Sequence, residues 1–256
     1  SFRRLPGLAA LAQAAHSGMF GTIHTARAWY HADYASDPSG ALSWRYASSQ
    51  AGPGALLDIG AHAIDALQFV AGDIAEVTSA SLRTVITERP VAAAGSVGHG
   101  ASTSTERGPV TNDDVALVTA VHESGAISQV SLSRIAHGVP NSLGVEVYGT
   151  AGSGWFDSIS GNEFHVFEAG LGNPAFNGPR RVFTGPNHPY FTNVAAMPGA
   201  GVGTGYAEAF TAEIQEFLVC VGSGQPMDTH FGVAHQTMKV VDAALVSAAE
   251  HRPVAL

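Results

Sequence analysis

The stretch LLDIGAHAID, residues 56–65, carries three titratable side chains in otherwise apolar surroundings. Asp58, His62 and Asp65 stand four and three residues apart, so on an α-helix that begins near Asp58 all three would face one side. Burying two carboxylates beside an imidazole costs desolvation energy unless the groups are paired, and such groups often have pKa values shifted toward a chemical role. The spacing predicts a catalytic site in which His62 exchanges a proton with the substrate and Asp65 orients the imidazole.

Two other interpretations fit the same residues. Asp58 is also suited to be an N-cap that accepts hydrogen bonds from backbone amides, with His62 a hydrogen-bonded histidine of the core. Carboxylate and imidazole donors can also hold a metal ion, but a stable site needs about three or four ligands, and no second His or Cys lies nearby in the sequence. We therefore predict no metal site.

The periodicity of apolar residues predicts the elements that must position these groups. Helices are expected over residues 5–16, 61–70, 206–221 and 231–251, where apolar side chains recur at helical spacing. Strands are expected over 21–31, from Ile74 to an end set by Pro90, over a hairpin at 113–123 and 126–136, and over 143–149, 154–157 and 163–169. Residues 32–54 and 92–109 are expected to be long loops, the second of them mobile.

The order of these elements indicates the fold class. Glycine-rich turns separate the strands, and two helices close the chain after them. We expect an α+β domain, an open and mostly antiparallel (mixed) β-sheet with helices packed on one face.

Composition excludes several classes of function. The 256 residues carry 21 acidic against 12 basic side chains, for a net charge of -9, and Lys239 is the only lysine, so nucleic-acid binding is not expected. The apolar runs are shorter than the ~18–20 residues of a membrane span. A lone cysteine, Cys220, and the lack of a visible signal peptide favour a cytoplasmic location. Because the chain opens at Ser1 directly into a helical pattern, we expect it to be a downstream piece of a longer protein.

Other polar and aromatic residues are candidates for contact with a ligand. Trp44 and Arg45 in LSWRY combine a flat stacking surface with a fork of hydrogen-bond donors, which suits a polyhydroxylated ring. His188 in TGPNHPY and His137 after the strand that ends near Arg134 are weaker candidates, since a lone histidine in a loop is often incidental. The glycine-rich stretch 198–210 does not follow a GxGxxG pattern and is read as a helix-entry loop.

Together these residues resemble a known family. The stretch GALLDIGAHAIDALQFVAGDIAEVTS is similar to the C-terminal domain of the glucose-fructose oxidoreductase, inositol dehydrogenase and rhizopine-catabolism (Gfo/Idh/MocA) family, whose motif places Asp, His four residues later and often Asp three beyond. SFRRLPGLAAL, LSWR, ERP and both closing helices are similar as well, so the resemblance covers nearly the whole chain. TGPNHPY and GVGTGY resemble the levoglucosan dehydrogenase-like branch.

The resemblance implies a two-domain dehydrogenase. An N-terminal Rossmann domain, absent from this chain, would hold NAD or NADP, and residues 1–256 would form a single substrate-binding and oligomerisation domain. Hydride would pass between the nicotinamide and a carbon of a sugar or cyclitol. The chain would assemble as a homodimer or homotetramer through its sheet face.

The resemblance also assigns roles to matching positions. His62 would be the general acid/base, Asp58 would bind substrate and Asp65 would support them. Tyr30 and Asp33 would line the pocket together with Trp44 and Arg45.

Two departures limit the resemblance. The family's Glu-Lys-Pro motif and any dinucleotide fingerprint are absent, so this chain alone should not turn over, and Ala32 stands where the branch has a glutamine. The alternative is therefore that the chain is a non-catalytic carbohydrate-binding or oligomerisation module. A third alternative is a hydrolase or lyase that uses the same pocket.

Overall fold

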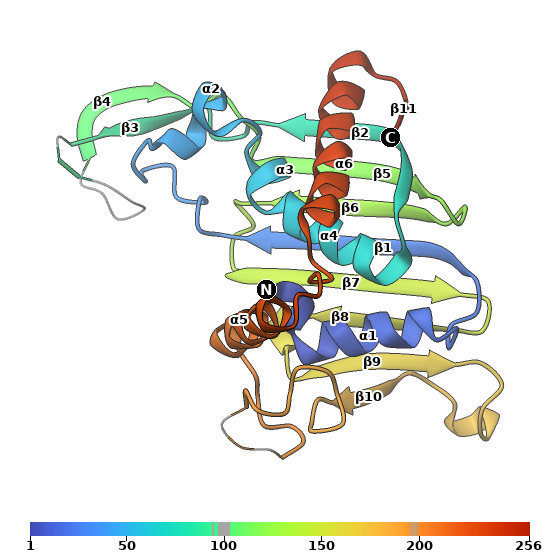
Figure 1. Ribbon diagram of the computed structural model, residues 1–256. Coiled ribbons are helices and arrows are strands. Elements are labelled where there is room, and N and C mark those ends of the chain that lie inside the picture. The colour runs from blue at the N-terminus through green and yellow to red at the C-terminus, as the bar shows by residue number, and fades with distance from the viewer. Residues whose placement is uncertain (94, 97–102, 196, 198) are drawn as a thin grey trace.

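A computed structural model describes all residues of the chain except 94, 97–102, 196 and 198 (Figure 1). The strands are β1 (Ile23–Ala32), β2 (Ile74–Arg83), β3 (Glu88–Ala92), β4 (Thr103–Pro109), β5 (Val115–His122), β6 (Ile127–Ser133), β7 (Asn141–Gly149), β8 (Gly152–Asp157), β9 (Glu163–Glu168), β10 (Arg180–Phe183) and β11 (Val254–Ala255). The helices are α1 (Pro6–His16), α2 (Ser48–Ala51), α3 (Ala55–Asp58), α4 (Gly60–Ala71), α5 (Tyr206–Ser223) and α6 (Phe231–Glu250), with short 3₁₀ turns that include η1 (Phe2–Arg4) and η2 (Trp44–Tyr46).

The described strands form one nine-stranded sheet and one two-stranded sheet. The large sheet has the order β10-β9-β8-β7-β1-β6-β5-β2-β11, and β3 pairs with β4. In the large sheet β1 and β6 run parallel, and the other neighbouring pairs are antiparallel. The predicted fold class, a mixed and mostly antiparallel sheet, is confirmed.

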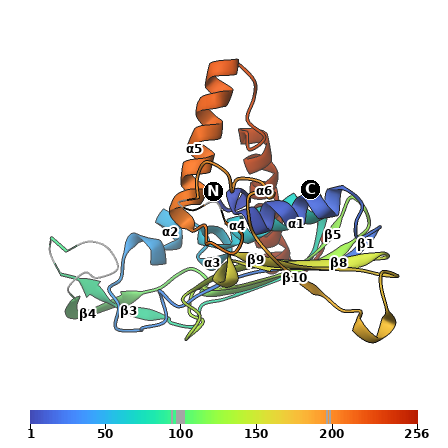
Figure 2. The same ribbon diagram turned by 90° about the horizontal axis from the view of Figure 1, so that it is seen from below.

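The long helices lie on one face of the large sheet, as predicted (Figure 2). Alternate residues of β1, including Ala26, Ala28 and Tyr30, point to this face and are buried. Ile64 and Leu67 of α4 are fully buried in the same hydrophobic core. The apolar side of α4 therefore meets the apolar face of the sheet, and the described residues leave the opposite face of the sheet uncovered (Figure 2).

Two boundaries in the middle of the chain were predicted wrongly. Residues 103–109 form strand β4, although 92–109 was expected to be a loop; positions 94 and 97–102 of that loop lie outside the described residues. Pro90 lies inside β3, a separate strand from β2, and does not end one long strand. Both strands of this ribbon carry few buried apolar residues, so the hydrophobic pattern gave little signal for them.

One segment is long and apolar enough to cross a membrane by composition alone. It is Ser48–Ala71, and 67% of its most apolar window is buried inside the fold. The segment is divided into α2, α3 and α4, which are separate helices. Its apolar side chains are thus used in the core of the domain, as in many globular proteins.

Candidate active site

Asp58 and His62 sit on either side of a break between two helices. Asp58 is the last residue of α3, and His62 lies in the first turn of α4, which begins at Gly60. The expected single helix beginning near Asp58 is therefore wrong, because Ile59 separates the two helices with φ of -111°. Nor does Asp58 cap α4, whose N-cap is Ile59. The two side chains nevertheless remain neighbours at the start of α4.

A buried carboxylate from another part of the chain fixes α3. Asp113 accepts hydrogen bonds from the amides of Gly54 at 2.7 Å and Leu56 at 2.8 Å, and its carbonyl accepts from the Ala55 amide at 2.9 Å. These amides belong to the start of the helix, where backbone donors have no partner within it. A Cβ on Gly54 would lie 2.0 Å from the Asp113 carbonyl oxygen, so the approach requires glycine. Asp113 thereby sets the position of the helix that ends at Asp58.

A second glycine lets α4 approach the sheet closely. A Cβ on Gly60 would lie 2.6 Å from Cδ1 of Leu132 in β6. The first turn of α4 therefore packs directly over the middle of the sheet, and His62, two residues on, projects at the edge of this contact. The glycines of the GALLDIGAH stretch are required by the packing that positions Asp58 and His62.

The Asp58 carboxylate is held by a phenol. Tyr34, two residues after β1, donates its hydroxyl proton to Oδ2 of Asp58 at 2.6 Å. Burial raises the pKa of Tyr34 well above its usual value, and the hydrogen bond to Asp58 adds to the rise. Tyr34 therefore stays protonated and remains a donor over the whole physiological range.

Aromatic rings form one wall beside His62. The ring of Phe2 lies 5.3 Å from the imidazole and that of Tyr30 lies 6.1 Å from it, measured between centroids. Tyr206 at the start of α5 packs edge-on against Phe2 at 5.9 Å. Burial raises the pKa of Tyr30 to about 12, with Tyr206 and Asp58 acting in the same direction. The imidazole thus contacts two aromatic rings, and the carboxylates of Asp65 and Asp58 lie close enough to act on its charge.

These surroundings favour the neutral form of His62. Desolvation lowers the pKa of His62 below its usual value. The carboxylates of Asp65 and Asp58 oppose this shift, but desolvation outweighs them. The side chain still has an exposed edge. A neutral, accessible imidazole can accept a proton from a bound hydroxyl group.

Asp65 is held in an ion pair with η1. Arg3 binds it in a bidentate manner, with Nε to Oδ2 at 2.8 Å and Nη2 to Oδ1 at 2.5 Å. The guanidinium also lies over the ring of Phe69, 4.7 Å from the centroid. Asp65 therefore acts on His62 through its charge and by anchoring η1, which carries Phe2, against α4.

The other predicted ligand-binding residues lie at three places in the fold, two of which are close to the ends of β1 and β6 or in η2. Asp33 follows β1 directly, and His137 lies just beyond β6, at the same end of the sheet, where the Ala136 amide donates to the Ala32 carbonyl. Arg45 stacks over exposed Trp44 at 4.6 Å in η2.

His188 lies at a third place. It packs against Phe164 of β9 at 5.5 Å, in a pocket bordered by α1, away from His62. Tyr30, Asp58 and His62 are thus brought together, whereas His188 is in separate surroundings and its role stays a prediction.

Three aromatic residues of the site were not predicted. Phe2, Tyr34 and Tyr206 come from η1, the loop after β1 and the first turn of α5. Tyr34 is adjacent to the predicted Asp33, and Tyr206 ends the GVGTGY motif, so weak signals for both exist in the sequence. Their contacts join segments far apart in the chain, which no local pattern reveals.

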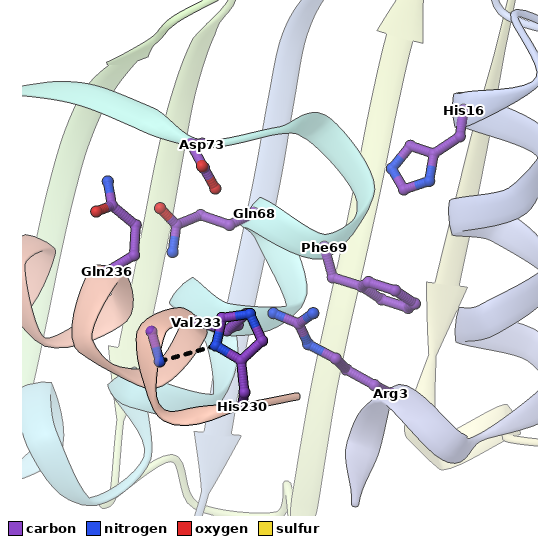
Figure 3. Close-up of a pocket in the computed structure, with 9 residues that line it drawn as sticks. Arg3, His16, Gln68, Phe69, Asp73, His230, Val233 and Gln236 are labelled. Atoms are coloured by element: carbon purple, nitrogen blue, oxygen red, sulfur yellow. Dashed lines mark hydrogen bonds between the residues drawn. The ribbon is translucent and has the colours of Figure 1, made fainter. Parts of the chain in front are cut away.

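A pocket of about 480 Å³ lies farther along α4 (Figure 3). It is bordered by Arg3, Phe69, His16 and His230, and His230 accepts a hydrogen bond from the Gly232 amide at 3.0 Å. Its α4 residues lie about two helical turns beyond His62. Asp58, His62 and Asp65 are not among the residues that line this pocket, although Arg3, which borders it, is paired with Asp65.

Neither a metal site nor a nucleotide cradle is formed by the described residues. Among them, no group of three or more His, Cys, Asp or Glu side chains is placed to hold a metal ion. The single parallel strand pair of the described sheet, β1 with β6, is not part of a dinucleotide-binding unit with a glycine fingerprint.

Comparison with known proteins identifies the family. Residues 8–154, more than half of the chain, match the family described as the GFO/IDH/MocA C-terminal domain. The chain belongs to the Gfo/Idh/MocA family. The resemblance stated from the sequence is thereby confirmed, and the α3–α4 segment with Asp58 and His62 lies inside the part that matches this Gfo/Idh/MocA domain.

Similar proteins extend the comparison beyond the matched Gfo/Idh/MocA domain. Levoglucosan dehydrogenase of Pseudarthrobacter phenanthrenivorans is 34% identical over 252 residues, or 98% of this chain. A levoglucosan dehydrogenase structure in complex with NADH and levoglucosan has a TM-score of 0.90 at 32% identity and covers 100% of the chain. An oxidoreductase domain protein from Kribbella flavida has a TM-score of 0.88 at 35% identity and covers 99%. The chain spans 64% of the length of each of these three proteins.

Proposed function

We propose that this chain is the substrate-binding and catalytic C-terminal portion of an NAD(P)-dependent dehydrogenase that acts on a hydroxyl-bearing carbon of a sugar or cyclitol. The observation that carries the proposal is the neutral, accessible imidazole of His62 beside the carboxylate of Asp58, which Tyr34 holds at 2.6 Å. A levoglucosan dehydrogenase with 33% identity to this chain has been crystallised with NADH and L-sorbose, and one with 32% identity with NADH and levoglucosan.

The chain's own residues handle the alcohol and its proton. A substrate hydroxyl bound between His62 and Asp58 loses its proton to the imidazole, which becomes imidazolium. The two carboxylates near the ring, Asp58 and Asp65, stabilise that positive charge. The rings of Phe2 and Tyr30 shield one side of the reacting group from water.

The coenzyme would be held outside the described residues. NAD(P), when bound by a separate dinucleotide-binding domain, supplies the acceptor for the hydride that leaves the carbinol carbon. This division of labour accounts for a catalytic histidine in a chain whose described part lacks a nucleotide cradle.

Replacement of His62 tests the proposal. In the full-length protein, His62→Ala should lower kcat/KM for oxidation by about 10²–10⁴-fold, the usual contribution of a general base. The assay is coenzyme reduction across a panel of sugars and cyclitols with both NAD and NADP. His235→Ala, at an exposed position on α6, is the control and should leave kcat/KM unchanged. Activity of His62→Ala equal to wild type would remove the proposed role.

The pH dependence of kcat/KM, compared between wild type and His62→Ala, is a second test. Because the pKa of His62 is lowered, the imidazole stays neutral at neutral pH and is protonated only below its usual value near 6.5. The wild-type kcat/KM for oxidation should therefore be level near neutral pH and fall as pH drops through that lowered pKa. The residual activity of His62→Ala should lack this acid limb.

Assembly through the sheet is part of the proposal. The face opposite the helices is uncovered (Figure 2), and Leu117, Ile127 and Tyr148 on it are 43%, 58% and 42% exposed. Trp155 and His165 stack there with ring centroids 4.6 Å apart. Exposed apolar side chains on an open sheet face are typical of contacts between subunits, and a second copy of the chain would cover them.

A further inference from the structure

One motif of the sequence, ERP at Glu88–Pro90, has no part in the function proposed above. Its arginine, Arg89, lies in β3 and is only 1% exposed, although the partner strand β4 is almost entirely exposed. The guanidinium lies over the ring of buried Tyr46, 4.3 Å from the centroid. Arg89 therefore points away from solvent, toward the loop of residues 33–43 that joins β1 to η2.

The described hydrogen bonds of Arg89 go to the backbone of this loop. Its Nη1 donates to the Asp37 carbonyl at 2.7 Å, and its Nη2 donates to the Ala35 carbonyl. Its Nε has no hydrogen-bond partner among the residues that the structure describes. A guanidinium that is buried against carbonyls instead of a carboxylate keeps much of its desolvation cost, which an apolar side chain in the same space would not have. What Arg89 adds to the fold is the placement of two loop carbonyls.

The Ala35 peptide connects Arg89 to the candidate active site. The Ala35 amide donates to the Arg134 carbonyl at 3.1 Å, so the backbone is held on both sides of Ala35. Tyr34 directly precedes Ala35 and donates to Asp58 at 2.6 Å. The Tyr34 side chain is 38% exposed, so burial holds it only in part. The reach of its hydroxyl to Asp58 thus depends on where the backbone of the loop lies.

We propose that Arg89 is a positioning residue of the candidate active site, an inference that rests on the function proposed above. By holding the Ala35 carbonyl, Arg89 sets the loop so that the Tyr34 hydroxyl meets the Asp58 carboxylate. The hydrogen bond between them is lost when the hydroxyl moves by about 1 Å, and misplacement on this scale is enough to slow an enzyme. Arg89 touches neither His62 nor Asp58 in any contact of the described residues, so its effect on the site passes through Tyr34.

The NMR signal of a single tyrosine tests the positioning directly. In the full-length protein labelled with ¹³C at Cζ of tyrosine, the Tyr34 resonance is the one that Tyr34→Phe removes. Arg89→Met fills about the space of the arginine stem but donates no hydrogen bond, so Tyr34 should lose Asp58 and its resonance should shift. Arg89→Lys keeps the charge without the planar fork and should shift the same resonance in the same direction.

Arg107→Lys is the matched control for these variants. Arg107 lies on β4, is exposed, and donates to the Glu88 carbonyl at 2.7 Å. The same replacement there removes a planar fork from the same ribbon without touching Ala35. The Tyr34 resonance of Arg107→Lys should coincide with that of wild type.

Kinetics test whether the positioning matters for the reaction. Arg89→Met should lower kcat/KM for oxidation by up to about tenfold, the loss expected for the Tyr34 hydroxyl itself, and should move the acid limb of the pH profile to higher pH. In a Tyr34→Phe background the same replacement should change neither quantity. A merely structural role of Arg89 would lower kcat/KM equally in both backgrounds.

The outcomes separate this inference from the proposed function. A Tyr34 resonance that stays unmoved in Arg89→Lys overturns the inference whatever the activity, and this variant decides if Arg89→Met does not fold. An equal loss of kcat/KM with and without the Tyr34 hydroxyl also overturns it and leaves the proposed function intact. If the wild-type protein reduces neither NAD nor NADP with any sugar or cyclitol, the proposed function fails, whereas a shifted resonance still shows that Arg89 places Tyr34.

Discussion

At the scale of single residues, the candidate site is defined by how neighbours alter two titratable groups. His62 is kept neutral by desolvation against the opposing charges of two carboxylates. Asp58 is bound to Tyr34, whose raised pKa keeps its proton in place. The chemistry of the imidazole therefore depends on a tyrosine that does not touch it in any contact described. We predict that Tyr34 is a positioning residue that acts on His62 through Asp58.

Removal of the phenol hydroxyl tests whether Tyr34 acts on His62 through Asp58. Tyr34→Phe in the full-length protein should lower kcat/KM for oxidation roughly tenfold, the equivalent of about 1.4 kcal/mol for a lost hydrogen bond to a charged group. Without the phenol, Asp58 presents more of its charge to His62, which favours the imidazolium and raises the pKa of His62. The acid limb of the pH profile should therefore move to higher pH, an effect that a purely structural role of Tyr34 would not produce.

A double-mutant cycle provides the control. If Tyr34 acts through the carboxylate, Tyr34→Phe in an Asp58→Asn background should change kcat/KM and the acid limb little. Equal losses in both backgrounds would show that the phenol acts on something other than Asp58.

At the scale of elements, the break between α3 and α4 positions Asp58 and His62. Asp113 caps α3, and Gly60 lets α4 lie against Leu132 of the sheet. The capping carboxylate lies 59 residues from Gly54 in the sequence. The geometry of the site is thus set by a contact between the loop before β5 and the helix entry.

Replacement of Asp113 should destabilise the domain. Asp113→Asn keeps one acceptor but places an NH₂ group against a backbone amide, so a buried donor loses its partner. The expected loss is about 2–3 kcal/mol of the free energy of unfolding, measured as a lower urea midpoint. Asp37→Asn is the matched control, because Asp37 is exposed and caps only its own turn at Ser39; it should change stability by less than about 0.5 kcal/mol. A midpoint for Asp113→Asn equal to that of Asp37→Asn would contradict the capping role.

The sequence predicted the strongly periodic elements and missed those that depend on distant contacts. The closing helices and the helix after Asp58 follow from apolar spacing, and so does the mixed sheet. The separate helix α3 was missed, because its first amides are capped by Asp113, a residue far away in the sequence. Strand β4 was missed because its side chains are nearly all exposed. The partnership of Tyr34 with Asp58 joins residues 24 positions apart across a loop, and local pattern carries no information on it.

At the scale of the whole molecule, the domain has two uncovered apolar surfaces on opposite sides. The exposed apolar residues of α5 begin at Tyr206, beside the active site, whereas the open face of the sheet lies on the other side of the molecule (Figure 2). The open face of the sheet is proposed to receive another copy of the chain. Because the nine-stranded sheet separates them, each surface can be altered without direct contact with the other.

A charge on the open face of the sheet should therefore dissociate the assembly. Ile127 pairs with Thr25 of β1, which in turn pairs with Tyr148 of β7, so these side chains form one row on that face. In Ile127→Asp, assembly would bury a carboxylate without a partner, at a cost of several kcal/mol. Light scattering of the full-length protein should show a smaller mass for Ile127→Asp than for wild type at the same concentration. Val219→Asp, the same kind of change at an exposed position of α5, should keep the wild-type mass. If Ile127→Asp keeps it too, the sheet face is not the contact between copies, and some other surface must hold any assembly together.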